Sequence, residues 1–485
     1  MLNHNMTPDT GISDTLSTSL PQDTICAVST PPGVGGIAVI RVSGPKAVDI
    51  VDTLFRPNGL GDPLSQRRTH TLAYGEIYSH EGDLLDQVVV SLFRAPHSYT
   101  GQDTVEISCH GSTYIAQQII LALIHSGCRG AGPGEFTRRA FANGRLDLSQ
   151  AEAVADLIAS RSAAAHRVAM NQMRGGFSRE LADLRAHLLQ FVSLIELELD
   201  FSEEEVQFAD RRQLDELACH IETVITRLAD SFSRGNAIKN GIPTIIIGET
   251  NAGKSTLLNA LLREERALVS DIHGTTRDTV EDIIDLQGIT YRLIDTAGIR
   301  ETHDTVESMG IERTFAKLAQ ADIVLWLIDG TQSDAHVQQL AQRIVPQCKE
   351  KKLFALINKT DLLTPAQIAE KQELLANLHI APEQILPLSA KNNRNIDTLQ
   401  DALVAHATQA MAANDTIVTN VRHYEALVRA RQSIQRARQG LAHNYPGDLL
   451  AQDIRETMHH LGEITGEITT DEILGNIFKN FCIGK

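Results

Sequence analysis

The stretch IIIGETNAGKST, residues 245–256, has the order of a buried strand, a glycine-rich loop and the first turn of a helix. Its glycines allow backbone N–H groups to turn toward phosphate oxygens, and the start of the helix adds a positive dipole. Within this G-x-x-x-x-G-K-S pattern, Lys254 can reach the β- and γ-phosphates and the Ser255 hydroxyl can bind Mg²⁺. The stretch predicts a nucleoside triphosphate site made by Asn251, Ala252, Gly253, Lys254, Ser255 and Thr256.

Motifs that follow later strands of the same segment indicate the base of the nucleotide. The motif D-T-A-G comes after the apolar run 291–294, N-K-T-D ends the run 353–357, and S-A-K follows the last strand. Ligands bind at this end of parallel strands. The Asp361 carboxylate can accept from guanine N1–H and N2–H₂, donors that adenine lacks, and a backbone N–H of S-A-K can reach guanine O6. The nucleotide is therefore predicted to be GTP, bound also by Asp295, Thr296, Ala297, Gly298, Asn358, Lys359, Asp361, Ser389, Ala390 and Lys391.

The segment between the phosphate loop and D-T-A-G carries the motif G-T-T-R-D. Its Thr276 is placed to give Mg²⁺ a second protein oxygen when the γ-phosphate is present. A loop held by that contact would order with GTP and loosen after hydrolysis. The whole run is expected to contact the nucleotide, namely Ser270, Asp271, Ile272, His273, Gly274, Thr275 and Thr276.

Hydrolysis of GTP needs an aligned water molecule and a cation at the developing negative charge. In Ras-like enzymes a glutamine directly after D-x-x-G aligns that water, whereas here the position holds Ile299. An apolar side chain can neither orient water nor neutralise charge. Another residue must therefore orient the water, and either a partner's side chain or a bound ion must meet the charge.

Length and composition limit the remaining possibilities. A chain of 485 residues is expected to form about two to four domains. Its net charge of −17 and its aromatic content of 4% argue against an autonomous clamp on nucleic acid. The six cysteines lie far apart, which is typical of a reducing compartment, and neither a signal peptide nor a membrane span is expected. These features predict a soluble, cytoplasmic protein.

Changes of residue pattern along the chain predict a multidomain fold. Residues 1–23 are polar and are expected to be a flexible leader, within which Met6 could be the true start. An α+β domain is expected over 24–145, with strands at 25–30, 37–42, 84–93 and 104–108 and a helix at 112–125. Helical patterns over 146–240 and 407–485 flank an α/β segment at 241–406. We expect an α/β domain inserted between two helical halves that pack together.

Taken in order, these motifs resemble those of the tRNA-modification GTPases of the MnmE family, also called TrmE. The discriminating parts are P-P-G-V-G-G at 31–36 and the C-terminal F-C-I-G-K at 481–485. The resemblance implies a folate-binding-like N-terminal domain, a discontinuous all-α domain and an inserted Ras-like P-loop domain. It also implies a homodimer that joins an FAD-dependent partner of the MnmG (GidA) type in a heterotetramer. Together they would install a carboxymethylaminomethyl group at C5 of a tRNA wobble uridine, with the tRNA bound mainly through the partner.

The resemblance further implies a GTPase activated by K⁺ through dimerisation of its GTPase domains. Oxygens of Asn251, Ser270, Ile272 and Thr275 would bind K⁺, and Glu307 would orient the attacking water. An ion near the bridging phosphate oxygens can take the place of an arginine finger. The residues alone leave other interpretations open, because Asn251 could be an amide that braces the loop and Glu307 an exposed carboxylate at a helix start.

A reduced folate, 5-formyl- or 5,10-methylene-tetrahydrofolate, is implied as the source of a one-carbon unit. By motif its site would include Arg41, Glu106, Arg145 and Lys485, of which Arg145 stands where the family has lysine. A carboxylate can accept from pterin N–H groups, and cations can hold the glutamate tail. The resemblance raises a catalytic role for Cys482, although a small core residue is the alternative.

Two other functions remain open from the sequence. One is a ribosome-assembly GTPase switch of the Era or Der kind. Those proteins carry an RNA-binding domain after the GTPase domain, or a second GTPase domain, whereas this chain has one phosphate loop and a helical C-terminal part. The other alternative treats the N-terminal domain as a dimerisation scaffold that binds no folate.

Overall fold

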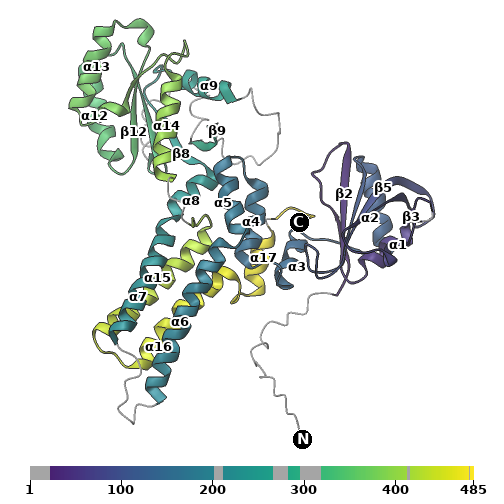
Figure 1. Cartoon of the computed structure of the whole chain (residues 1–485). Helices are drawn as coiled ribbons and strands as arrows, with labels where there is room; N and C mark the ends of the chain where they lie inside the picture. Colours follow the sequence, from purple (N-terminus) through teal and green to yellow (C-terminus); the bar gives the residue numbers. More distant parts are fainter. Residues whose placement is uncertain are drawn as a thin grey trace. The chain divides into compact units, whose positions relative to one another are not determined.

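The computed structural model describes residues 22–59, 61–200, 211–265, 282–294, 318–411, 416–479 and 481–484. Most of the predicted leader lies outside these ranges. The chain divides into two compact units, Met1–Ala155 with Thr465–Lys485, and Asp156–Ile464. Figure 1 labels many of the helices and strands of both units.

A seven-stranded sheet forms the N-terminal part of the first unit, in the order β3-β4-β5-β6-β2-β1-β7. Its neighbouring strands are antiparallel except β1 and β7, which run parallel. Strand β5 has the bounds expected from the sequence. The strands are β1 (Ile25–Val28), β2 (Ile37–Ser43), β3 (Phe55–Pro57), β4 (Thr71–Tyr78), β5 (Leu84–Phe93), β6 (Thr104–His110) and β7 (Arg129–Gly130).

Helices cover both faces of this sheet. On one face, α1 (Ala47–Leu54) and α2 (Thr113–His125) share a core with the strands, near the short helix η1 (Leu64–Gln66). Successive residues of a strand point to opposite faces. Accordingly, Ile25 and Ala27 of β1 pack on the other face against Phe136 of α3 (Glu135–Ala142).

The C-terminal tail belongs to the same unit as this sheet. Phe478 of α17 (Asp471–Lys479) is buried against Leu148 and Ala151 of α4 (Leu148–Ala159). Residues from Thr465 onward therefore group with the N-terminal part of the chain. The domain boundary drawn at residue 407 stays a prediction.

The helices of the second unit come from both sides of the inserted domain. Before it lie α5 (Ala163–Met173), α6 (Gly176–Asp200), α7 (Arg211–Asp230) and α8 (Phe232–Asn240), and after it α15 (Val421–Ala442) and α16 (Gly447–Thr465). The apolar residues of α7 recur at helical spacing and are buried: Leu214, Ala218, Ile221, Ile225 and Leu228. They share one core with buried residues of α15 and α16. The discontinuous helical domain is thereby confirmed.

A close backbone contact joins the two chain segments that lead into and out of the inserted domain. Gly235 of α8 lies so near the later segment that an added Cβ would be 1.9 Å from the carbonyl oxygen of Val418. The Val418 N–H donates to the Ser231 hydroxyl at 3.0 Å. Only glycine allows the helix to approach this closely.

The inserted domain is a six-stranded sheet in the order β13-β12-β11-β8-β10-β9, parallel except for the β9–β10 pair. Strands β8 and β11 are apolar and buried almost throughout, as central parallel strands are. Their bounds are β8 (Ile242–Ile247), β9 (Asp282–Leu286), β10 (Ile289–Ile294), β11 (Ile323–Asp329), β12 (Lys352–Asn358) and β13 (Ile385–Pro387). The predicted α/β domain is confirmed.

Helices pack on each face of this second sheet (Figure 1). One face is covered by α9 (Lys254–Glu265) and α14 (Ile396–Met411), and the other by α12 (Asp334–Ile344) and α13 (Pro365–Asn377). Short 3-10 helices complete the connections, namely η3 (Val345–Cys348), η4 (Thr360–Leu362) and η5 (Pro382–Gln384).

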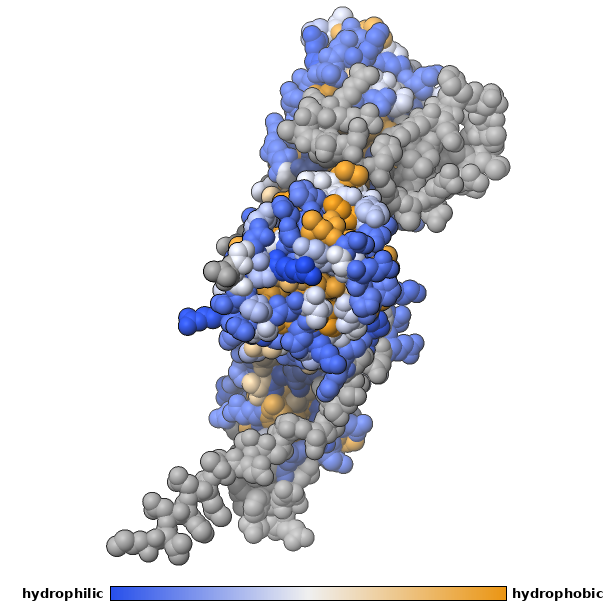
Figure 2. Space-filling model, turned by 90° about the vertical axis from the view of Figure 1, so that its right-hand side faces the viewer, coloured by the Kyte–Doolittle hydropathy of each residue, from blue (hydrophilic) through white to orange (hydrophobic). Residues whose placement is uncertain are grey.

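The surface is mostly polar. Figure 2 shows a hydrophilic face on which hydrophobic side chains form small patches between polar ones. None of the helices in the described ranges combines the length and the apolar character that crossing a bilayer requires.

Candidate functional site

The phosphate loop lies where the sequence places it, between the end of β8 at Ile247 and the start of α9 at Lys254. Gly253 has a φ of +101°, a conformation that favours glycine. A Cβ at this position would lie 2.4 Å from Nδ2 of Asn358. The glycine therefore allows the loop to approach strand β12 closely.

The side chain of Lys254 folds back onto the phosphate loop that precedes it. Its ammonium donates to the carbonyl oxygens of Gly248, at 2.9 Å, and Glu249, at 2.8 Å. Burial lowers the pKa of Lys254, and the nearby Glu249 carboxylate opposes that shift. A partly desolvated ammonium surrounded by loop carbonyls is placed to move onto a phosphate oxygen, which is a stronger acceptor.

Asn358, at the end of β12, connects the phosphate loop to the S-A-K motif. Its Nδ2 donates to the carbonyl oxygen of Ala252 at 2.7 Å, and its Oδ1 accepts from the Ala390 N–H at 2.9 Å. The side chain is buried, with 3% exposed. The amide of Asn358 thus fixes the phosphate loop relative to the S-A-K motif.

The residues predicted to read guanine lie together. Oδ1 of Asp361 accepts from the Ser389 hydroxyl at 2.6 Å, and this hydrogen bond lowers the pKa of Asp361. The carboxylate is therefore ionised, as accepting from two guanine donors requires. The structure thus brings Asp361, Ser389 and Asn358 together, as a guanine pocket requires.

The S-A-K motif is held by its own backbone. Ser389 and Arg394 form an antiparallel bridge, in which the Ser389 N–H donates at 3.1 Å. Because the Ala390 N–H donates to Asn358, Lys391 is the motif residue whose N–H has no recorded acceptor among the described residues. The Lys391 N–H is therefore available as a donor to a ligand.

The structure adds Asp329, which no motif indicated, as the partner of the predicted residue Lys359. Lys359 has a left-handed φ of +63°, and its ammonium binds Asp329 at the end of β11 at 2.6 Å. Burial alone would raise the pKa of Asp329, but hydrogen bonds from Lys359 and Thr331 lower it. Because Asp329 holds the ammonium, the aliphatic part of the Lys359 side chain can pack against one face of a base. The one sequence feature that could have indicated Asp329 as a site residue is its position at the end of an apolar run.

A second unexpected contact holds the phosphate loop from helix α12. Glu249 binds His336 of that helix, with Oε1 and Nε2 2.6 Å apart, and also accepts from Gln332. No spacing in the sequence links these residues. The loop is thus tied to β12 on one side and to α12 on the other.

Part of the predicted site lies outside the described residues. These positions are Ser270, Asp271, Ile272, His273, Gly274, Thr275, Thr276, Asp295, Thr296, Ala297, Gly298 and Glu307. Strand β10 ends at Ile294, directly before Asp295, and Ile294 pairs with Ile245 of β8. The C-terminal end of β10 therefore lies at the same edge of the sheet as the C-terminal end of β8.

In the first unit, Arg41 and Glu106 lie opposite each other on β2 and β6. Arg41 Nε donates to Glu106 Oε1 at 2.9 Å, and its Nη2 lies 2.8 Å from the same oxygen. The guanidinium also lies over the rings of Tyr99, at 5.3 Å, and Phe136, at 5.6 Å. The half-buried Arg41–Glu106 ion pair therefore lies beside two aromatic rings.

The C-terminal tail reaches this pair. The carbonyl oxygen of Gly484 accepts from Arg41 Nη1 at 3.4 Å and from the Ser29 hydroxyl at 3.1 Å. Gly484 has a φ of +93°, and a Cβ there would lie 2.4 Å from the carbonyl oxygen of Val28. Lys485, the next residue, lies outside the described residues.

Among the described residues, Cys482 and Arg145 form no hydrogen bond or ion pair with Arg41 or Glu106. The Cys482 side chain is exposed, so the interpretation of Cys482 as a core residue is wrong. Its carbonyl oxygen accepts from the Gly134 N–H at 3.3 Å. Arg145 is exposed and packs beside Gly101, and among the described residues no contact joins it to Glu106.

We predict that Asn358→Ala weakens guanine nucleotide binding about 10- to 100-fold, because it leaves two buried backbone groups unpaired at a cost of about 1–3 kcal/mol. The dissociation constant is measured by titration with a fluorescent guanine nucleotide. Asn377→Ala, at an exposed position of α13, is the matched control and should leave binding unchanged. Equal affinity of both variants would contradict the bracing role of Asn358.

Comparison with known proteins covers almost the whole chain. Residues 24–145 match the family described as GTP-binding protein TrmE N-terminus, and residues 148–482 match the MnmE helical domain. The tRNA modification GTPase MnmE of Bacteroides thetaiotaomicron is 58% identical over 465 residues, 96% of this chain and 100% of that protein. The protein of the same name from Christiangramia forsetii is 54% identical over 472 residues, 96% of this chain and 99% of the relative. The chain therefore belongs to the family of tRNA modification GTPases called MnmE.

Proposed function

We propose that the chain hydrolyses GTP and takes part in tRNA modification. The observation that carries the proposal is the double hydrogen bond of Asn358, which holds the phosphate loop and the guanine-reading loop in one frame. The relatives that match the chain along its length are named tRNA modification GTPases. The match along the whole chain also disfavours the ribosome-assembly switch as an alternative.

The residues around the phosphate loop fit Mg·GTP. Lys254 would donate to the β- and γ-phosphates, and the exposed Ser255 hydroxyl at the start of α9 would bind Mg²⁺. Thr276 and, through water, Asp295 would complete the Mg²⁺ ligands. Asp361 and Lys391 would distinguish guanine from adenine by its donors and its O6 acceptor.

We propose that K⁺ supplies the positive charge that hydrolysis needs. The position after D-T-A-G holds Ile299 in place of a glutamine. Asn251 is exposed in the phosphate loop with a left-handed φ of +64°, so its side-chain oxygen is available to an ion. Ser270, Ile272 and Thr275 would supply further oxygens, and Glu307 would orient the water.

We further propose that the Arg41–Glu106 pair belongs to a site for a reduced folate, 5-formyl- or 5,10-methylene-tetrahydrofolate. Both contacts of Arg41 use Oε1 of Glu106, so the other carboxylate oxygen is available to pterin N–H donors. The rings of Tyr99 and Phe136 would flank a flat ligand. Lys485 and Arg145 would bind its glutamate carboxylates, and Cys482 would act on the one-carbon unit.

The complete reaction proposed is the installation of a carboxymethylaminomethyl group at C5 of a tRNA wobble uridine. A homodimer of this chain would join an FAD-dependent partner of the MnmG type in a heterotetramer. The folate would supply carbon, the flavin would supply redox chemistry, and GTP hydrolysis would control opening and closing of the complex.

Nucleoside analysis of tRNA tests this function. Cells lacking the chain should lose the carboxymethylaminomethyl group at the wobble uridine, and the wild-type gene should restore it. Lys254→Ala, which removes the phosphate contact, should fail to restore it, whereas Arg68→Ala, at an exposed position of the first unit, should succeed. Retained modification in cells without the chain would contradict the assignment.

The ion proposal predicts that replacing Na⁺ by K⁺ at equal ionic strength stimulates GTP hydrolysis. Asn251→Gly tolerates the left-handed φ but removes the side-chain oxygen, so it should reduce the stimulation about tenfold or more. Asn444→Gly, at another exposed position with positive φ, controls for the backbone effect. Steady-state phosphate release gives the rates, and a wild-type rate indifferent to K⁺ would refute the proposal.

A further inference from the structure

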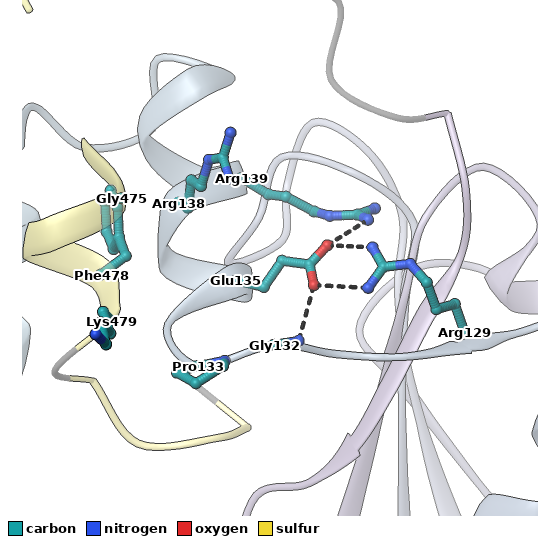
Figure 3. Close-up of a pocket in the computed structure, with 9 residues that line it drawn as sticks. All are labelled: Arg129, Gly132, Pro133, Glu135, Arg138, Arg139, Gly475, Phe478 and Lys479. Carbon is teal, nitrogen blue, oxygen red and sulfur yellow. Dashed lines mark hydrogen bonds and ion pairs between the residues drawn. The ribbon is translucent and has the colours of Figure 1, made fainter. Parts of the chain in front are cut away.

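A pocket of about 460 Å³ opens in the first unit, between helix α17 and the segment that runs from β7 into α3 (Figure 3). Positively charged side chains dominate its lining, namely Arg129, Arg138, Arg139 and Lys479. None of its lining residues belongs to the phosphate loop or to the Arg41–Glu106 pair. A chain with a net charge of −17 concentrates positive charge here.

Glu135 and Asp23 satisfy two of these cations. Glu135 accepts from Arg129 at 2.6 and 3.1 Å, from Arg139 at 2.9 Å and from the Gly132 N–H at 2.9 Å (Figure 3). Asp23 accepts from Arg129 at 2.6 Å and from Arg139 at 2.7 Å. Burial alone would raise the pKa of Glu135, but these donors lower it to about 2. Two arginines and two carboxylates therefore form a neutral, fixed frame.

Arg138 and Lys479 remain as the uncompensated charges. They come from α3 and α17, and both side chains are exposed. Among the described residues, neither side chain forms a hydrogen bond or an ion pair. The neighbouring arginines and carboxylates already neutralise one another. The positive charges of Arg138 and Lys479 are therefore available to bind an anion from outside the chain.

The chemistry of the pocket favours a phosphodiester. The forked guanidinium of Arg138 can donate twice to a phosphate, and the ammonium of Lys479 adds a point charge. The exposed Pro133 adds apolar surface to the same pocket, which suits the sugar next to a phosphate. A polyanion will contact an acidic protein where positive charge is concentrated.

The pocket adjoins the tail that reaches the proposed folate site. Pro133 pairs with Ile483, and the Gly134 N–H donates to the carbonyl oxygen of Cys482. The loop that lines the pocket is therefore the loop that holds Cys482. A nucleic-acid strand held here would pass close to the exposed Cys482 side chain.

We propose that Arg138 and Lys479 bind backbone phosphates of the tRNA and so guide it toward the one-carbon site. The inference rests on the proposed function, because it takes tRNA as the substrate. It adds a contact between this chain and the RNA to those proposed for the partner.

The test compares tRNA binding by the full-length wild type and by the double variant Arg138→Ala/Lys479→Ala over a range of salt concentrations. Two lost phosphate contacts should weaken binding roughly tenfold and reduce the slope of log K against log salt by about two. Lys46→Ala/Arg68→Ala removes two exposed cations of the same unit and should change neither quantity. The charge-conserving variant Arg138→Lys/Lys479→Arg should retain most of the binding.

Basal GTP hydrolysis should be equal in all these proteins, and an unchanged thermal unfolding curve shows that the substituted unit is folded. Unchanged tRNA affinity and salt slope in the double alanine variant would overturn the inference while the proposed function stands. Weaker binding of a reduced folate diglutamate with unchanged tRNA binding would overturn it in favour of the folate tail. Loss of the wobble modification in cells remains the separate test of the function itself.

Discussion

The buried amide of Asn358 connects parts of the nucleotide site that are far apart in the sequence. Its donor holds Ala252 of the phosphate loop, and its acceptor holds Ala390 of the S-A-K motif. An amide can do this because it carries a donor and an acceptor on one rigid group. Gly253 is required beside it, since a Cβ would collide with the same amide. The relative position of phosphate and base therefore depends on this one side chain.

The inserted position of the GTPase domain gives it two connections to the helical core. Gly235 and Ser231 hold the later segment at Val418, and Gln172 Nε2 donates to the carbonyl oxygen of Ile417 at 3.0 Å. The two chain segments are thus fixed to each other where they join the helices. The inserted domain is thus connected to one shared core, in which residues of both helical halves are buried.

Local patterns predicted the elements whose chemistry lies in consecutive residues. The apolar run of β8, the glycines and the Lys-Ser pair identified the phosphate loop, and the alternation of 84–93 gave β5 its bounds. Strand β4 was missed. Its Gly75 reads as a turn residue, although it lies in the strand where a Cβ would be 2.2 Å from the carbonyl oxygen of Arg56. Contacts between distant residues had no signal, including Asp329 with Lys359, Glu249 with His336, and the pocket shared by α3 and α17.

Exchanging the base tests most directly the central claim that one inserted site reads guanine through Asp361. Guanine presents N2–H₂ to the carboxylate, whereas xanthine presents a carbonyl oxygen at the same position. In Asp361→Asn the amide can donate to that oxygen while still accepting from N1–H. Affinity for GTP should fall about tenfold or more, and xanthosine triphosphate should become the preferred substrate. A variant that still prefers GTP, or a wild type that prefers ATP, would contradict the account.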